Sequence, residues 1–213
     1  MDYGDLAAAL LRGMWVTVQI TAGAALVAGV AACVAGLARS SARRLLRWPA
    51  AVYVEVFRGT SALVQLFWIY FVLPRFGIDI GAMAAAIVAL GLNAGAYGAE
   101  VVRGALRAVP QAQRDAAAAL SLSPAQTLRR VVWPQAVPAM LPPAGNLAIE
   151  LLKNSALVSL IAVTELTFAA QLARTATLQT TEIFGLVLLA YFALALCITG
   201  AVRFLEKRLG VAA

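Results

Sequence analysis

The chain contains a series of long apolar stretches without a single charged side chain. They cover residues 13–38, 59–74, 80–99, 131–149 and 183–202. An α-helix needs about 20 apolar residues to cross the ~30 Å hydrocarbon core of a bilayer. With 62% hydrophobic and 13% charged residues, the chain is also far more apolar than a typical soluble domain. We therefore expect an all-α, polytopic membrane helical bundle of about five transmembrane helices.

The fourth stretch needs adjustment, because prolines at positions 134, 138, 142 and 143 interrupt its start. Glu150 and Lys153 separate it from a further apolar run at 154–164. We therefore place this span at 138–162. The predicted spans are then 13–38, 59–74, 80–99, 138–162 and 183–202, and residues 1–213 form a single transmembrane domain. Of the intervening segments, residues 39–58 read as a short basic loop, and the loop 100–133 is long enough to hold structure of its own.

The position of the charges predicts the orientation of the chain. Most of its 17 basic residues follow the first, third and fifth spans. Because Lys and Arg are retained in cytoplasmic loops, the N-terminus should lie outside and the C-terminus in the cytoplasm. The net charge of +7 is thereby explained by orientation in the lipid bilayer, and we predict no nucleic-acid partner.

Several chemistries are not expected in this chain. It has no histidine, and its two cysteines, Cys33 and Cys197, lie in predicted spans without metal-ligand spacing. We therefore predict no metal site and no catalytic residues. A phosphate-binding loop of the GxxxxGK[ST] type is also missing from the sequence, so any ATP hydrolysis must occur in another subunit.

The cytoplasmic loop 100–133 carries signals for two short helices. Pro110 suits the first turn of a helix and Ala116 to Ala119 favour helical structure, which predicts a helix over 110–120. Ser123-Pro124-Ala125-Gln126 reads as a capping box, which predicts a second helix over 124–133 ending before Pro134. On physical grounds alone, this hairpin is equally compatible with an interfacial element that only stabilises the loop.

The same loop resembles a known motif. Asp115-Ala116-Ala117, Ser121, Val131, Trp133 and Pro134 match the spacing of the EAA loop of ABC importer permeases, which reads EAA, three residues, Gly, nine residues, then I-x-L-P. Asp replaces Glu and Ser replaces Gly in this chain. A glycine at position 121 would adopt a left-handed turn at no steric cost, so Ser121 predicts a modestly strained or differently shaped turn.

Further segments extend the resemblance over most of the chain. They are VEVFRGTSALVQLFW (54–68), LNAGAYGAE (92–100), AVPQAQRDAAAALSLS (108–123) and LPPAGNLAIELLKNSALVSLIAVTEL (141–166). Together they resemble the permease family of ABC importers for polar amino acids, which includes histidine, glutamine, arginine and opine systems. Ser61 in the FRGTS segment, together with NAGAYGAE, is similar to ectoine and hydroxyectoine permeases.

This resemblance implies a type I ABC importer permease-like fold in the bacterial cell membrane and a set of partners. The partners would be ABC ATPase subunits that bind ATP with Mg²⁺, a second permease copy or a homologous permease, and an extracellular solute-binding protein. This chain itself would hold no cofactor and would transport a polar amino acid or a related compatible solute such as ectoine. By analogy, the residues that contact the ATPase are Asp115, Ala116, Ala117, Leu120 and Ser121.

Polar side chains inside predicted spans need an explanation, because an ionised residue at the bilayer centre costs about 2.5–3.5 kcal/mol. Helical spacing places one group on a common face of the fourth span and a second group on the third. We predict that both line the substrate pathway, although polar side chains also bridge helices, and Glu150 can pair with Lys153. The two groups are Asn146, Glu150, Lys153, Asn154 and Ser155, and Asn93, Tyr97 and Glu100.

Two alternatives stay open from the sequence. An ATP-independent secondary transporter or channel subunit would also explain the spans and the polar face, but it would not need an alanine-rich hairpin at this spacing. A subunit that only completes a heteromer would explain the departure at Ser121. Uptake that persists without ATP would favour the first alternative.

Overall fold

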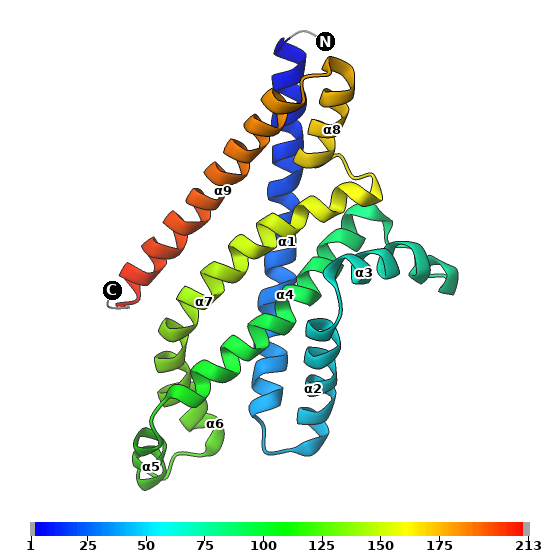
Figure 1. Ribbon diagram of the computed structural model, residues 1–213. Coiled ribbons are helices and arrows are strands. Elements are labelled where there is room, and N and C mark those ends of the chain that lie inside the picture. Colours follow the sequence, from blue (N-terminus) through cyan, green and yellow to red (C-terminus); the bar gives the residue numbers. More distant parts are fainter. Residues whose placement is uncertain (1–2, 211–213) are drawn as a thin grey trace.

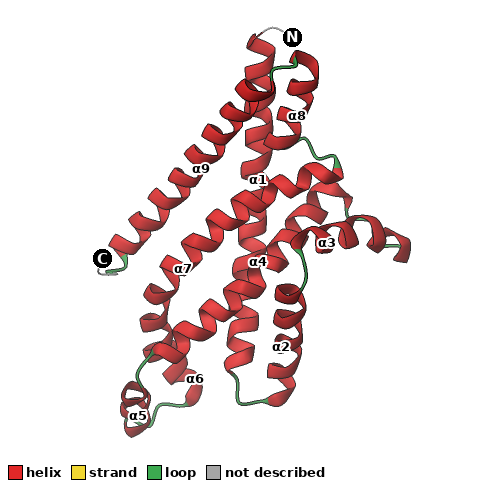
Figure 2. Ribbon diagram, in the orientation of Figure 1, coloured by secondary structure: helices red, strands yellow, loops and turns green. Residues whose placement is uncertain are grey.

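The structure, a computed structural model, describes residues 3–210, which are helical apart from short connections (Figure 2). Three helices are each long and apolar enough to cross a bilayer: α1 (Tyr3–Ser40), α4 (Gly81–Ala108) and α9 (Thr180–Arg208). Figure 1 shows α1 running the length of the bundle. The beginning of α1 lies at one end with α8, and the α1–α2 turn and α5 lie at the other, so the basic segments that follow the first and third predicted spans share one end.

Two bent helix pairs complete the bundle. In the first, α2 (Arg44–Gly59) meets α3 (Ala62–Phe67) and its π and 3₁₀ continuations (Trp68–Val72, Leu73–Phe76) at 107°. In the second, α6 (Pro124–Thr127), a π-helical turn (Leu128–Val132), α7 (Trp133–Asn154) and a 3₁₀ helix (Ser155–Ile161) meet α8 (Leu166–Thr177) at 53°. Counting each pair as one span gives up to 5 spans. The expected all-helical bundle of about five spans is confirmed.

Helix α2 differs from the expected basic loop at 39–58. Its Val54 is fully buried in a cluster with Ala35 and Ala99, while Arg44 and Arg47 are exposed. The hydroxyl of Tyr53 donates to the Leu92 carbonyl oxygen over 2.7 Å and thereby ties α2 to α4. A search for charge-free stretches misses such a helix, because charged residues interrupt its apolar positions: Arg44, Arg47, Glu55 and Arg58.

The contact between α1 and α4 forms the centre of the bundle and depends on glycines of α4. The backbones come so close that a Cβ added at these glycines would collide with α1. Such an atom would lie 2.6 Å from Val27 Cβ at Gly91, 2.7 Å from Ala31 Cβ at Gly95 and 2.7 Å from Ala32 Cβ at Gly98. Small residues at helix interfaces allow this close packing in membranes.

The second helix of the 100–133 loop does not end before Pro134, as the sequence predicts. It passes through a π-helical turn into α7, where the N–H of Trp133 donates to the Leu128 carbonyl oxygen. The wider turn accommodates the proline ring next to the preceding carbonyl groups, and Pro134 has no N–H to leave unpaired. Helix α8 had no counterpart among the predicted elements.

Candidate functional site

Helices α5 (Gln111–Ala119) and α6 are joined by a well-defined turn. The N–H of Leu122 donates to the Ala117 carbonyl oxygen over 3.1 Å, and that of Ser121 to the Ala118 carbonyl oxygen over 2.9 Å. These bonds form a Schellman motif in which Ser121 has a left-handed φ of 57°. The serine therefore takes the conformation that suits glycine. The predicted capping box at Ser123 and Gln126 is present, with bonds of 3.3 and 2.9 Å.

The predicted ATPase-contact residues differ in exposure. Asp115, Ala116 and Ser121 are exposed, and Leu120 is 76% exposed at the end of α5. Ala117 is only 3% exposed and packs inside the hairpin. We refer to the segment 111–133 as the coupling segment. Its exposed side offers a short apolar and small-residue surface to a partner, and the role of each residue in that contact stays a prediction.

Replacing Ser121 with Gly should stabilise the coupling segment by about 1 kcal/mol, because the left-handed backbone conformation is sterically unfavourable for a residue with a Cβ. Slower amide hydrogen exchange at residues 120–122 in the purified protein would measure this gain. A Ser121→Val variant, which is β-branched, should shift the exchange in the opposite direction. Equal exchange rates in all three proteins would contradict the strain at this position.

The predicted polar residues of α4 face α2 and α3. The Asn93 amide is buried and donates to the Phe57 carbonyl oxygen at 3.0 Å and to Gln65 Oε1 at 3.1 Å. The guanidinium of Arg58 lies over the Tyr97 ring, with its central carbon 5.3 Å from the ring centroid. These two side chains therefore bridge elements within the chain, and a role in the pathway stays a prediction for them.

Glu100 forms ion pairs with Arg39 of α1 and Arg103 of α4. Arg103 Nε donates to Glu100 Oε2 over 3.0 Å, and Arg39 also lies 3.6 Å from Glu55. The cluster joins α1, α2 and α4 near the basic end of the bundle. The sequence identified Arg39 only as an orienting charge, because Glu100 is 61 residues away from it in the chain.

The predicted polar residues of α7 lie apart from those of α4. Asn146, Glu150 and Lys153 are exposed, Asn154 is half-buried, and Ser155 is buried with its hydroxyl bonded to the Leu152 carbonyl oxygen at 2.6 Å. Among the residues that the structure describes, Glu150 and Lys153 form no ion pair, and no hydrogen bond joins the two groups. The α7 residues thus form a polar stripe on a face that this chain leaves open.

Comparison with known proteins identifies the family. Residues 25–211 match the family described as "Binding-protein-dependent transport system inner membrane component". The chain is 44% identical to a probable amino-acid ABC transporter permease of Sinorhizobium fredii, over 97% of this chain and 90% of the relative. The chain belongs to the amino-acid ABC transporter permease family. The permease is also 37% identical to the glutamine transport system permease GlnP of Escherichia coli, over 93% of this chain and 90% of GlnP.

A solved structure agrees with this assignment. The permease superimposes on a chain of an amino acid ABC transporter crystallised with histidines, with a TM-score of 0.88, 32% identity and coverage of 98% of this chain and 99% of the other. As a permease subunit, the protein is a multi-pass component of the inner or plasma membrane, and it is not itself the ATPase of its transporter.

The permease also contains a buried polar cluster that sequence reasoning missed. Glu165 is fully buried at the N-cap of α8, where its carboxylate accepts from the Phe168 N–H at 2.8 Å. It accepts as well from the hydroxyls of Tyr191 at 3.0 Å and Thr17 at 3.3 Å. Glu165 was not among the site residues predicted from the sequence. A carboxylate directly before an apolar helical run was the available signal, because such residues cap helix N-termini.

Replacing Glu165 with Ala should lower the free energy of unfolding of the permease by about 3 kcal/mol, since three buried donors lose their acceptor. The thermal midpoint of the purified protein in detergent measures the loss. Glu182→Ala, at an exposed position in the first turn of α9, serves as the control and should leave the midpoint unchanged. Equal midpoints for the two variants would contradict the stabilising role of the cluster.

Proposed function

We propose that the permease forms, together with a second permease subunit, the pathway by which a polar amino acid enters the cell. ATP hydrolysis in separate ATPase subunits would drive the transport, and an extracellular solute-binding protein would deliver the solute. The polar stripe on α7 carries this proposal, because it places three polar side chains on an open face of an otherwise apolar helix.

A single chain cannot keep this stripe away from lipid. Glu150 and Lys153 are both exposed, and an ionised side chain in hydrocarbon costs about 2.5–3.5 kcal/mol on insertion scales. A second permease subunit facing α7 would enclose the stripe in a water-filled path between the subunits. A single helical turn would then present a carboxylate and an ammonium group, which suits a zwitterionic solute that carries both charges.

The coupling segment supports the use of ATP. It extends from the basic end of the bundle (Figure 1), and its exposed Leu120 and Ala116 offer a compact surface to a partner protein. The Schellman turn and the capping box fix the two short helices relative to each other. A rigid hairpin of this kind transmits the closure of a partner to α7, with which α6 is continuous.

The names of the relatives support a polar amino acid as the solute. One similar protein is a glutamine permease of Escherichia coli, and the others reported above are amino-acid transporter components. Only the FRGTS and NAGAYGAE segments favour ectoine, so ectoine enters the experiment as a competitor and not as the expected solute.

Reconstitution into vesicles with the co-purified ATPase and the binding protein tests the proposal. Uptake of radiolabelled glutamine, arginine, histidine and ectoine is measured with ATP or with a non-hydrolysable analogue inside. We expect one amino acid to be taken up only with ATP. Equal uptake with ATP and with the analogue would support the secondary transporter or channel instead. Selective uptake of ectoine would identify ectoine, and not an amino acid, as the transported solute.

Replacing Glu150 or Lys153 with Ala should reduce ATP-driven uptake by a factor of about 10 to 150, the effect of losing a charged contact worth about 1.5–3 kcal/mol. The amount of assembled complex should stay unchanged, because both side chains are exposed in the chain. Uptake per molecule of complex is the measurement, and Glu182→Ala is again the control. Reduced assembly with normal uptake per complex would assign these residues to helix bridging.

A further inference from the structure

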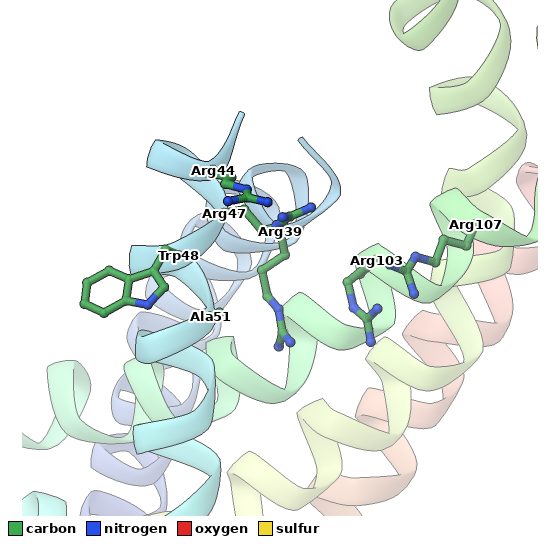
Figure 3. Close-up of a pocket in the computed structure, with 7 residues that line it drawn as sticks. All are labelled: Arg39, Arg44, Arg47, Trp48, Ala51, Arg103 and Arg107. Atoms are coloured by element: carbon green, nitrogen blue, oxygen red, sulfur yellow. The ribbon is translucent and has the colours of Figure 1, made fainter. Parts of the chain in front are cut away.

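A cavity of about 300 Å³ lies between the α1–α2 turn and α4, and arginines dominate its lining. Figure 3 shows Arg39 of α1 lying between Arg44 and Arg47 of α2 on one side and Arg103 and Arg107 of α4 on the other. Ala51 and Trp48 of α2 complete the lining. The side chains therefore come from three separate elements, which only the fold brings together.

The arginines of this pocket are not neutralised by the protein. Glu100 pairs with Arg39 and Arg103, and Glu55 also lies near Arg39. In the part of the chain that the structure describes, Arg44, Arg47 and Arg107 have no carboxylate within 4.0 Å. Like charges held this close repel one another, so an anion with several acceptor oxygens would be stabilised there.

The surface next to the pocket is apolar and exposed. Leu45, Trp48, Val52 and Val56 recur along one side of α2 and are 90%, 72%, 42% and 52% exposed. Figure 3 shows the Trp48 ring pointing away from the arginines, outward from the bundle. At ~1.5 Å per residue this stripe is about 16 Å long, close to the thickness of one leaflet of the hydrocarbon core. Tryptophan is also enriched at the level of the lipid headgroups.

From these observations we propose that the pocket binds an anionic phospholipid of the cytoplasmic leaflet. Its phosphate would lie among Arg44, Arg47 and Arg107, and its acyl chains would follow the exposed stripe of α2. Basic pockets between membrane helices on the cytoplasmic side bind anionic headgroups in this way. The lipid would join the α1–α2 turn to α4. This inference does not rest on the transported solute or on the route of transport.

Native mass spectrometry of the delipidated permease–ATPase complex tests the site. The complex is titrated with phosphatidylglycerol, with phosphatidylcholine of the same acyl chains, and with inorganic phosphate. We expect saturable binding of phosphatidylglycerol that weakens with added salt, and at least tenfold weaker binding of phosphatidylcholine. Equal affinity for the two lipids would overturn the proposal, and so would binding of inorganic phosphate that prevents binding of phosphatidylglycerol.

Matched variants locate the site. Replacing both Arg44 and Arg47 with Gln should weaken phosphatidylglycerol binding about 25-fold, since each basic residue near an anionic headgroup contributes about fivefold. The same double change at Arg203 and Arg208, exposed on α9 outside the pocket, should change it less than twofold. Arg44→Lys with Arg47→Lys keeps the charge and should retain most of the binding. Identical losses in the two Gln pairs would indicate a general charge effect and overturn the site.

Discussion

Replacing Gly95 with Leu should almost abolish the folded permease in the membrane. A Cβ at this position would lie 2.7 Å from Ala31 Cβ and 3.0 Å from the Tyr53 hydroxyl oxygen. The larger side chain would push α1 away from α4, and it would push α2 away from both helices. Such overpacking lowers the free energy of unfolding by about 3 kcal/mol or more. Fluorescence-detected size-exclusion chromatography of the membrane extract measures the yield, which we expect to fall more than tenfold.

The control for this change lies on the same helix. Gly104 has no atom within 4 Å of an added Cβ, so Gly104→Leu gains the same helix propensity without a collision. Its yield should match that of the unmodified protein. If Gly95→Leu and Gly104→Leu gave equal yields, the close contact of α1 with α4 would not be what holds the bundle together.

Replacing Leu120 with Asp should uncouple transport from ATP. Leu120 is 76% exposed at the end of α5, so the change leaves the permease folded. An apolar anchor at the centre of a protein contact contributes about 2 kcal/mol or more, which corresponds to about a thirtyfold loss of binding. We expect ATP-driven uptake in vesicles to fall by about that factor, together with the amount of ATPase that co-purifies.

An equally exposed leucine at the other end of the bundle provides the comparison. Leu178 follows α8 and is 86% exposed, and Leu178→Asp should leave both uptake and ATPase recovery unchanged. Normal ATPase recovery with Leu120→Asp would remove this residue from the contact. Equal losses in both variants would indicate that a new charge on any exposed surface disturbs the complex.

The amino-acid sequence alone was enough to predict the membrane environment, the number of spans and the short helix and capping box of the coupling segment. These depend on local properties: apolar length against bilayer thickness, helix propensity in the alanines of α5, and hydrogen bonds between neighbours such as Ser123 and Gln126. The left-handed turn at Ser121 was also accessible, because a glycine position in the motif specifies that backbone conformation.

The contacts between polar residues became visible only in the folded bundle. Helical spacing placed Asn93 on one face of its helix, but it did not indicate the hydrogen bonds of Asn93 to Phe57 and Gln65 in the first bent helix pair. Glu165, which was not among the predicted site residues, joins Thr17 and Tyr191, which lie 148 and 26 residues away in the chain. Spacing along one helix fixes the face on which a side chain lies. The partner on that face depends on how distant helices pack, and that packing is set by the whole bundle.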